Sequence, residues 1–490
     1  MMKQKNKLVK NTKLNLPTWK AKTLQEKFAL QIIKKLQEKG FKNTLIVGGY
    51  VRDMLLKRPP LTPPYKGGEY SGGEIDIATP ASPKQVTTLL KKHKLIVIPT
   101  GLKHGTVTIH DTKAGNVEIT TFRSEGKYAD MRHPDSVKFI DDPGKDAARR
   151  DFTVNALFFD PVEKKIIDYI SGLADLKQKK LKFIGSAKAR IEEDALRLMR
   201  AVRFSAVLDL RLNPTDKKVI AKYAKHINKI SVERVKQELD KIMISENAAE
   251  GIRLLLKLKL LKEILSAVEQ LDKTPQSKNF HSEGNVFVHT LYAMSLLQSD
   301  AKLTTRYGLL FHDLGKAVTR KLVKKDGRPH TTFYNHQNKG VEIAKGIFKR
   351  LRFSNKDAQD IEWYIKNHHV PYEIKKMRKG KQAAWALDPR FPELLKIFRA
   401  DSLAAIPTDK GGRKLKPSLE SYDYAVKLWK RVQKNQSFSQ SLITGNDVMK
   451  ILKIKPGPKV GKVLGILREA QLSGKIKTKA EAIDYTKKLR

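Results

Sequence analysis

The sequence predicts an α+β head with a mixed sheet, followed by a long all-α body. Residues 25–39 have the apolar spacing of an amphipathic helix, and from about residue 186 onward the periodicity is almost purely helical. At 490 residues, the chain is long enough for about three or four domains. Short apolar segments typical of strands occupy residues 43–47, 75–79, 95–99, 105–110, 117–122 and 154–159.

The composition narrows the possible functions. The chain carries 98 Lys+Arg against 51 Asp+Glu, a formal net charge of +47, which predicts a polyanionic partner such as nucleic acid. A lysine-rich composition set by genome base content is the alternative explanation. The absence of cysteine excludes disulfide scaffolds, thiolate metal sites and cysteine nucleophiles. Neither a membrane-spanning run nor a signal-peptide core is present, so we expect a cytoplasmic protein with no membrane partner.

Polar, Pro/Gly-containing stretches near 272–284 and 405–418 predict boundaries in the body. A Pro/Gly-rich segment at 61–74 resembles an inserted loop in the head. The predicted division is a basic N-terminal tail at 1–24, a head at 25–180, a helical neck at 181–271, a body domain at 285–404 and a C-terminal helical arm at 419–490.

The first candidate site follows the strand at 43–47. Gly48 and Gly49 separate this strand from a helix, and two glycines let backbone N–H groups approach a phosphate closely. Arg52 would then face a triphosphate, with Asp53 bracing it. A glycine pair also marks many tight strand–helix corners, so this pattern alone leaves the structural explanation open.

Paired carboxylates follow on the next predicted strand. Glu74 and Asp76 alternate along it and therefore point to one face, where two carboxylates can hold Mg²⁺. Glu118 is a candidate third carboxylate on a neighbouring strand. Such ions stabilise both the attacking and the leaving oxygen of a phosphoryl-type transfer. An isolated pair of this kind is more often the solvated face of a strand.

In this order, the residues resemble the class II tRNA nucleotidyltransferases, which include the CCA-adding enzymes and the bacterial poly(A) polymerases. The resemblance continues downstream with a ribose-reading motif at 149–156, a nucleotide-selecting motif at 191–200 and a neck motif at 231–235. It implies a polymerase-β-like head, tRNA as partner, CTP and ATP as substrates and Mg²⁺ as cofactor. The catalytic residues would be Glu74, Asp76 and Glu118, and the nucleotide-binding residues Gly48, Gly49, Arg52, Asp53, Arg150, Asp151, Asn155, Asp194, Arg197 and Arg200.

The residues of the nucleotide-selecting motif also support this role directly. Asp194 and Arg197 are three apart on a predicted helix, hence on one face, and together offer acceptors and a planar donor fork to a base edge. Arg200 extends the same face by a turn and would reach a phosphate. The simpler alternative is an ordinary surface ion pair.

One position departs from the family pattern, which has aspartate where this chain has Glu74. The extra methylene moves the carboxylate by about 1 Å, a displacement that can lower a catalytic rate about 100-fold. A harmless insertion is the alternative, because loop length costs little free energy. One variant distinguishes the two hypotheses. Glu74→Asp would raise the rate if the geometry impairs catalysis, and would leave it unchanged if the insertion is harmless.

Histidines and carboxylates in the helical body predict a second metal site. Imidazole and carboxylate ligands from several helices suit a buried divalent transition metal. Their order, with His312-Asp313 in an apolar helix followed by Lys316, resembles the HD phosphohydrolases. The implied ligands are His289, His312, Asp313, His336, His368 and Asp401. A relic domain with a structural metal, or with none, is the alternative.

The C-terminal arm contains a Gly/Lys turn that opens a helix, with Lys455, Lys459 and Lys462 as candidate RNA contacts. Aromatic residues are only 7% of the chain, which favours recognition of folded RNA by shape and phosphates over base stacking.

The resemblance as a whole implies template-independent CCA addition to tRNA 3′ ends, with an added HD phosphohydrolase activity. Four alternatives stay open at this point. They are a poly(A) polymerase, an A-only or CC-only adder, an RNA-binding HD hydrolase whose head is inactivated by the 61–74 insertion, and a nucleotide-clearing phosphohydrolase with a structural head. The oligomeric state is not specified by the sequence.

Overall fold

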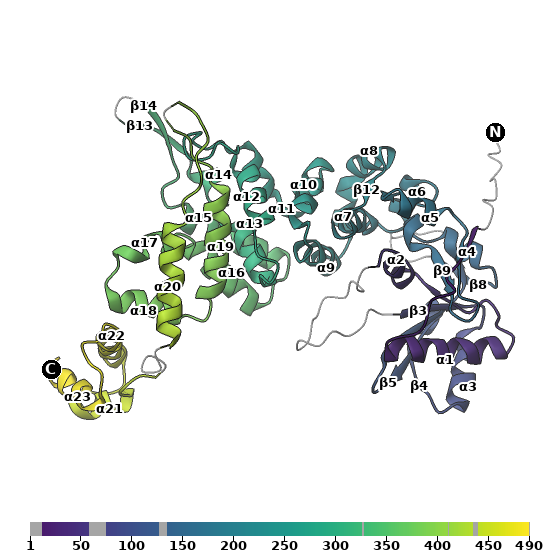
Figure 1. The fold of residues 1–490 in the computed structure, drawn as a ribbon, viewed down its shortest axis with the longest axis horizontal. Coiled ribbons are helices and arrows are strands. Elements are labelled where there is room, and N and C mark those ends of the chain that lie inside the picture. The colour runs from purple at the N-terminus through teal and green to yellow at the C-terminus, as the bar shows by residue number, and fades with distance from the viewer. Residues whose placement is uncertain are drawn as a thin grey trace. The chain divides into compact units, whose positions relative to one another are not determined.

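The structure is a computed structural model that describes residues 12–57, 75–126, 135–325, 328–409, 411–434 and 440–489. The predicted loop at 61–74, including Glu74, and the first 11 residues of the predicted tail lie outside the described residues. The chain forms two compact units, shown in Figure 1: Met1–Ile242 with Lys257–Glu263, and Met243–Leu256 with Ile264–Arg490.

The head contains an eight-stranded sheet with the order β1-β10-β9-β2-β3-β6-β5-β4. Strands β3 and β6 are parallel and all other neighbours are antiparallel, so the predicted mixed sheet is confirmed. The strands are β1 (Thr12–Asn15), β2 (Leu45–Val47), β3 (Ile75–Thr79), β4 (Ile96–Gly101), β5 (Thr106–Asp111), β6 (Gly115–Thr121), β9 (Leu157–Asp160) and β10 (Lys165–Asp168).

Two parts of the sheet differ from the prediction. At one edge, β1 lies within the predicted tail and pairs with β10, and the sequence analysis expected a strand at neither segment. The strand predicted at 154–159 begins only at Leu157, because Thr153–Asn155 forms a 3₁₀ turn. Both departures depend on tertiary pairing, since neither segment has the alternation of an isolated strand.

Helices cover one face of this sheet. Helix α1 (Leu24–Glu38) packs on β3 and β6, and α3 (Pro83–Lys92) packs on β4 and β5. A capping box starts α1: the Thr23 hydroxyl accepts from the Glu26 backbone N–H, and the Glu26 carboxylate accepts from the Thr23 N–H at 2.9 Å. Buried isoleucines of β3 and β6 supply the face under α1, so the intervening carboxylates point to the opposite face.

The neck follows as short helices. These are α6 (Ala187–Glu193), α7 (Arg197–Leu208), α8 (Pro214–Tyr223), α9 (Val232–Met243), α10 (Ala248–Lys257) and α11 (Leu260–Gln270), whereas α4 (Pro143–Ala148) and α5 (Gly172–Lys177) precede them in the head. The parallel pair β11 (Lys180–Leu181) and β12 (Arg211–Leu212) interrupts them. Only β12 of this pair lies beyond residue 186, so it is a short exception to the almost purely helical structure expected there.

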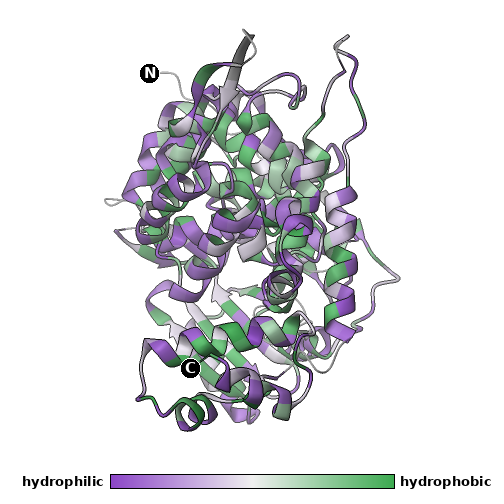
Figure 2. Ribbon diagram, turned by 90° about the vertical axis from the view of Figure 1, so that its left-hand side faces the viewer, coloured by the Kyte–Doolittle hydropathy of each residue, from purple (hydrophilic) through white to green (hydrophobic). Residues whose placement is uncertain are grey.

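Among its described residues, the second unit is helical except for the hairpin of β13 (Lys321–Lys325) and β14 (Arg328–Thr332), which the sequence did not predict. Its strands are too rich in charged and polar residues to be recognised from apolar alternation. The candidate metal ligands lie on α12 (Val286–Ser295), α15 (His336–Arg350) and α19 (Phe391–Ala404), and directly after the C-terminal ends of α13 (Leu303–Phe311) and α16 (Asn355–Asn367). Hydrophobic and hydrophilic residues share the same helices in Figure 2, as amphipathic packing requires.

The C-terminal arm has a small core of its own. Helices α21 (Gly445–Leu452), α22 (Pro458–Leu472) and α23 (Lys479–Lys487) enclose buried aliphatic residues that include Val448, Val463 and Leu467. Lys455, Lys459 and Lys462 are exposed at the start of α22. Among the described residues, no helix is both long and apolar enough to cross a membrane.

Candidate active site

The turn between β2 and α2 (Gly49–Leu55) brings three motifs together. Gly48 has φ = 76°, a conformation that strongly favours glycine. A Cβ at this position would lie 3.6 Å from both Asp76 Oδ2 and Arg150 Nη1. The bare glycine therefore lets the chain pass close to a carboxylate of β3 and to a guanidinium of the predicted ribose motif.

Two of the three predicted carboxylates lie side by side. Asp76 on β3 is directly opposite Glu118 on β6, and paired residues of neighbouring strands share a sheet face. Asp76 is half-buried and Glu118 is exposed. Their oxygens are the hard donors that a magnesium ion prefers, so the residues present fit such an ion. Glu74 lies outside the described residues.

A chain of buried hydrogen bonds joins the predicted phosphate and ribose motifs. Arg52 donates from Nε to Asp53 Oδ1 at 2.8 Å and from Nη1 to Asn155 Oδ1 at 2.6 Å. Asn155 Nδ2 donates in turn to Asp151 Oδ1 at 3.1 Å. Asp151 Oδ2 accepts from Arg200 Nε at 2.7 Å. One connected network therefore holds side chains from α2, the 150–155 segment and α7.

Asp151 is the central anion of this network. Its burial favours the neutral acid, but the charge of Arg200 and the hydrogen bonds of Asn155 and Arg200 outweigh burial and lower the pKa of Asp151 to about 2. The carboxylate is therefore ionised throughout the physiological range. Through its ion pair with Arg200, it also holds that guanidinium in place.

Asp146 is a residue of this site that the sequence analysis missed. Its buried carboxylate accepts from Arg149 Nε at 2.8 Å and from Arg150 Nη2 at 3.1 Å. Burial opposes its charge, yet Arg150 and Arg149 lower the pKa of Asp146 below its usual value. The spacing of three and four residues on α4 was the available signal, because such residues are neighbours on a helix surface.

The prediction that Asp194 and Arg197 share one helix face is wrong. Helix α6 ends at Asp194, which is extended (φ = −145°, ψ = 106°), and Arg197 begins the separate helix α7. The Asp194 side chain accepts from the backbone N–H of Leu196 at 3.0 Å, a local bond that competes with helix continuation.

The two side chains consequently have different partners. Asp194 accepts from Arg234 Nη2 at 2.9 Å, which ties the predicted nucleotide-selecting motif to the predicted neck motif. Arg197 pairs with Glu193 and donates to the backbone carbonyl of Arg149 at 3.3 Å. Both groups are held in fixed positions by protein contacts.

The guanidinium groups of three arginines in this region lie close to a single aromatic ring. The guanidinium carbons of Arg52, Arg200 and Arg203 lie 5.1, 5.0 and 4.0 Å from the centroid of the Phe204 ring. Arg203 also pairs with the buried carboxylate of Glu238 at 2.7 Å. The sequence analysis missed Phe204, since an aromatic residue on an apolar helix gives no separate signal.

In the second unit, all six predicted metal ligands lie in one cluster. Asp401 Oδ1 is 2.8 Å from His289 Nε2 and 3.5 Å from His312 Nε2. Asp313 Oδ1 is 3.5 Å from His336 Nε2, and the Nε2 atoms of His336 and His368 are 3.3 Å apart. The five helices thus bring together imidazoles and carboxylates that are far apart in sequence.

Backbone carbonyls fix the orientation of three of these rings. The Nδ1 atoms of His312, His336 and His368 lie 2.6, 2.8 and 2.7 Å from carbonyl oxygens three residues earlier. Because a carbonyl only accepts, each Nδ1 carries the hydrogen and each Nε2 faces the cluster. Outer contacts of this kind orient metal-ligating histidines in proteins generally.

Two tests indicate that the cluster fits a divalent metal. His312 Nε2 and Asp313 Oδ2, two atoms of kinds that can bind a metal, are buried and lie 3.1 Å apart, and Lys316 Nζ lies 2.7 Å from the same carboxylate oxygen. Burial lowers the pKa of His336 to about 4, so this imidazole is neutral and free to act as a ligand. Imidazole with carboxylate suits a transition metal.

Three further residues join the cluster without having been predicted. His369 Nε2 lies 3.3 Å from His336 Nε2. Glu283 Oε1 accepts from His289 Nδ1 at 2.7 Å and lies 2.8 Å from His281 Nδ1. The second of two adjacent histidines and a lone glutamate in a loop carry little signal on their own.

Asp151→Asn is expected to remove about 2 kcal/mol from the free energy of unfolding at neutral pH, the equivalent of its pKa shift. The folded-state pKa is depressed, so this contribution is present above about pH 4 and is lost as the pH falls toward about 2. Urea unfolding of both proteins across this range measures the difference. The exposed Asp209→Asn should have a much smaller effect. A difference that does not shrink at low pH would contradict the assignment.

Glu283→Gln is expected to weaken divalent-metal binding to the second unit by about 10- to 100-fold, because Glu283 orients His289. Calorimetric titration of metal-stripped protein with Ni²⁺, Mn²⁺ or Zn²⁺ measures this directly. The exposed Glu373→Gln in the same unit is the matched control. Equal affinities for the two variants would show that Glu283 has no positioning role.

Family models match successive parts of the chain. A poly A polymerase head domain matches residues 44–182, and a probable RNA and SrmB-binding site of polymerase A matches 209–271. An HD domain matches 281–406, and a putative tRNA nucleotidyltransferase domain 2 matches 432–485.

Solved structures share the fold. The CCA-adding enzyme of Bacillus stearothermophilus, in complex with CTP, has a TM-score of 0.70 at 24% identity and covers 96% of this chain and 98% of its own. The Thermotoga maritima CCA-adding enzyme, complexed with tRNA, has a TM-score of 0.56 at 17% identity, covering 94% of each chain. At these identities the likeness concerns the fold.

The family assignment rests on sequence identity to curated relatives. The CCA-adding enzyme of Lactococcus lactis subsp. lactis (strain IL1403) is 31% identical over 471 residues, which are 95% of this chain and 98% of that enzyme. The CCA-adding enzyme of Lactobacillus johnsonii is 39% identical over 236 residues, 48% of this chain and 54% of that enzyme. The chain therefore belongs to the class II CCA-adding enzymes that carry an HD domain.

Proposed function

We propose that this protein adds CCA to the 3′ end of tRNA, using CTP and ATP. The observation that carries the proposal is the buried network of Arg52, Asn155, Asp151 and Arg200 next to Asp76, which joins the phosphate, ribose and base motifs of the family in one site. Family membership over nearly the whole chain supports the same activity.

Gly48, Gly49 and Arg52, with Asp53 behind Arg52, bind the triphosphate. Glycine leaves the turn open to a phosphate, and the Arg52 guanidinium is held rigidly by its two partners. Asp76 and Glu118, with Glu74, would hold Mg²⁺, which supplies charge neutralisation at the reacting phosphate.

The remaining residues orient the nucleoside. Arg150, Asp151 and Asn155 position the ribose, and Asp194 and Arg197 read the base edge with support from Arg200. Arg234 and Glu193 fix the two base-reading groups in place, which suits selection by hydrogen bonds without a template. The tRNA 3′-hydroxyl oxygen attacks the α-phosphorus and gives its proton to water, the bond from this phosphorus to the α–β bridging oxygen breaks, and pyrophosphate leaves.

The domains proposed for these roles are the head at 25–180, the neck at 181–271, the HD domain at 285–404 and the arm at 419–490. The ranges of the matching family models support this division. In the arm, Lys455, Lys459 and Lys462 are proposed to contact tRNA phosphates. A tRNA substrate in a bacterial family also favours a cytoplasmic location.

A gel-resolved extension assay tests the proposed function. With Mg²⁺, CTP and ATP, a tRNA transcript lacking its CCA end should gain three nucleotides. Asp76→Asn should lower the rate by at least about 100-fold, because a charge that holds the metal is lost. Asp209→Asn, an exposed carboxylate of the same unit, is the matched control.

Other outcomes of the extension assay would identify the alternatives. A long A tail indicates a poly(A) polymerase, and one A or two C indicates a partial adder. No extension by the unmodified chain would mean that the head is inactive and would overturn the proposal.

The second unit favours a second function, a metal-dependent phosphohydrolase. The convergence of His289, His312, Asp313 and Asp401 carries it. Lys316 Nζ, 2.7 Å from Asp313 Oδ2, is proposed to contact the phosphate of the substrate. A bound transition metal would supply Lewis acidity there.

His312→Ala is expected to abolish hydrolysis of p-nitrophenyl phosphate and of a nucleoside 2′,3′-cyclic phosphate, because one of the proposed ligands is lost, while tRNA extension persists. Asp76→Asn should show the reverse pattern. Each activity is measured on each purified variant with Ni²⁺, Mn²⁺ or Mg²⁺ added. Hydrolysis that survives His312→Ala would place that activity elsewhere.

A further inference from the structure

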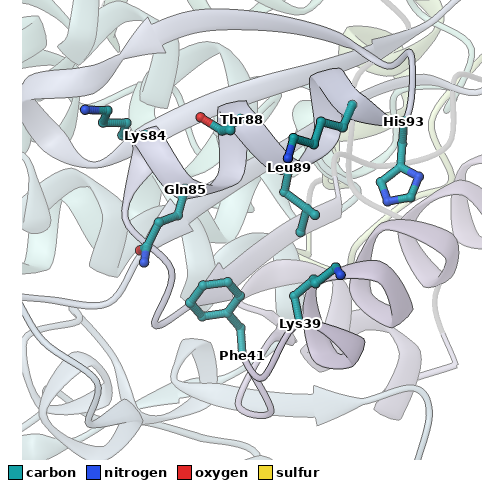
Figure 3. A pocket seen from close by; sticks show the side chains of 8 residues that line it. Lys39, Phe41, Lys84, Gln85, Thr88, Leu89 and His93 are labelled. Carbon is teal, nitrogen blue, oxygen red and sulfur yellow. The ribbon is translucent and has the colours of Figure 1, made fainter.

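A concave pocket of the head extends along α3 from its first turn to its C-terminal end and reaches the segment that follows α1. It has a volume of about 660 Å³, within the range of small-molecule sites. Figure 3 shows the side chains that line it, which are Lys39, Phe41, Lys84, Gln85, Thr88, Leu89, Lys92 and His93. None of the roles proposed above uses these residues.

The pocket is separated from the catalytic carboxylates by the sheet. Helices α1 and α3 pack on the face that carries the buried isoleucines of β3 and β6. Asp76 and Glu118 alternate with those isoleucines and point to the opposite face. A ligand in the pocket would therefore be distinct from the nucleotide at the catalytic site.

Unpaired positive charge surrounds the pocket. Lys39, Lys84 and Lys92 form no ion pair with any residue that the structure describes, and none of the eight lining residues is acidic. The ammonium of Lys35 lies 3.0 Å from His93 Nδ1 and adds a fourth lysine at the same end as Lys39. Converging cations without counter-charges attract a polyanion.

Apolar groups lie between the polar ends of the pocket. In Figure 3, Phe41 and Leu89 lie in the middle, with Lys84 and Gln85 toward one end and Lys39 and His93 toward the other. Both central side chains are half-buried. A flat ring can stack on Phe41, while the Gln85 amide offers both a donor and an acceptor to a base edge.

The walls of the pocket are held by two similar helix ends. After α1, the N–H of Phe41 donates to the carbonyl of Leu36 at 3.1 Å. Gly40, which lies between the cap residue of α1 and Phe41, has φ = 93°. After α3, the N–H of Leu95 donates to the carbonyl of Leu90 at 3.2 Å. These Schellman-type ends fix Phe41 and His93, so the pocket is formed before any ligand binds.

We propose that this pocket binds a second nucleoside triphosphate, separate from the substrate. Its base stacks on Phe41 next to Gln85, and its phosphates contact Lys39, Lys92 and the Lys35–His93 pair. Inorganic phosphate would leave the aromatic floor unused. The volume of about 660 Å³ has room for about one nucleotide, and one ring beside one amide suits a single base better than an RNA strand.

Equilibrium dialysis with labelled ATP and full-length protein tests the proposal. The unmodified chain should bind two ATP molecules, and the double variant Lys39→Glu/Lys92→Glu should bind one. The charge-matched control Lys27→Glu/Lys34→Glu changes two exposed lysines of α1 that do not line the pocket, and it should still bind two. One ATP per chain in all three proteins would overturn the proposal.

Two further measurements locate the ligand and identify its chemistry. ATP should slow hydrogen exchange in peptides covering 36–42 and 84–94, and this protection should disappear in the Lys39→Glu/Lys92→Glu variant only. Phe41→Leu should weaken ATP binding at this site by about tenfold while leaving tripolyphosphate binding unchanged, because only the stacked base is lost. If the lysine variant lowers affinity for tRNA but not the ATP stoichiometry, the surface contacts RNA and the nucleotide proposal is wrong.

Discussion

The head depends on one constraint: charges taken out of water must be paired inside the protein. Arg52 pairs with Asp53, and Asp151 pairs with Arg200 from a different segment. Asn155 links the two ion pairs, because its amide oxygen accepts from Arg52 and its amide nitrogen donates to Asp151. No other side chain of similar size both accepts and donates in this way without carrying a charge. The network therefore fixes the relative positions of motifs that are about 150 residues apart.

The second unit meets the same constraint in another way. Its imidazoles are anchored from outside, by carbonyls at Nδ1 of His312 and His368 and by Glu283 at His289, so their other nitrogens converge on one space. Anchoring by carbonyls leaves these rings neutral unless a charged neighbour intervenes. Asp313 and Asp401 are such neighbours, and they outweigh the effect of burial to raise the pKa of His312 to about 10. A metal at the cluster would take the place of that stabilising proton.

The sequence was sufficient where local pattern and tertiary role agree. The strand at 75–79 was predicted with its correct limits, because β-branched residues alternate there and one face is buried. Prediction from the sequence failed where a strand partner or a side-chain hydrogen bond determines the backbone conformation. Strand β1 exists because β10 pairs with it, and the break between Asp194 and Arg197 depends on a side-chain bond to the backbone. Glu283 and Phe204 act through the residues they hold, so motif spacing does not reveal them, and the only signal for Asp146 was its distance of three and four residues from two arginines.

Arginine and lysine have different tasks in this chain, which combines a formal net charge of +47 with a site of few, tightly held cations. The cations of the head network are arginines, whose planar forks hold a carboxylate at two points and stack on the Phe204 ring. The candidate RNA contacts Lys455, Lys459 and Lys462 are exposed lysines. A hydrated ammonium on a flexible stem suits phosphates of variable position, and the release of counterions from RNA favours many such contacts over a few rigid ones. The lysine excess thus suits binding of the polyanion as a whole, whereas the proposed selection of CTP and ATP assigns that task to the few buried arginines and their partners.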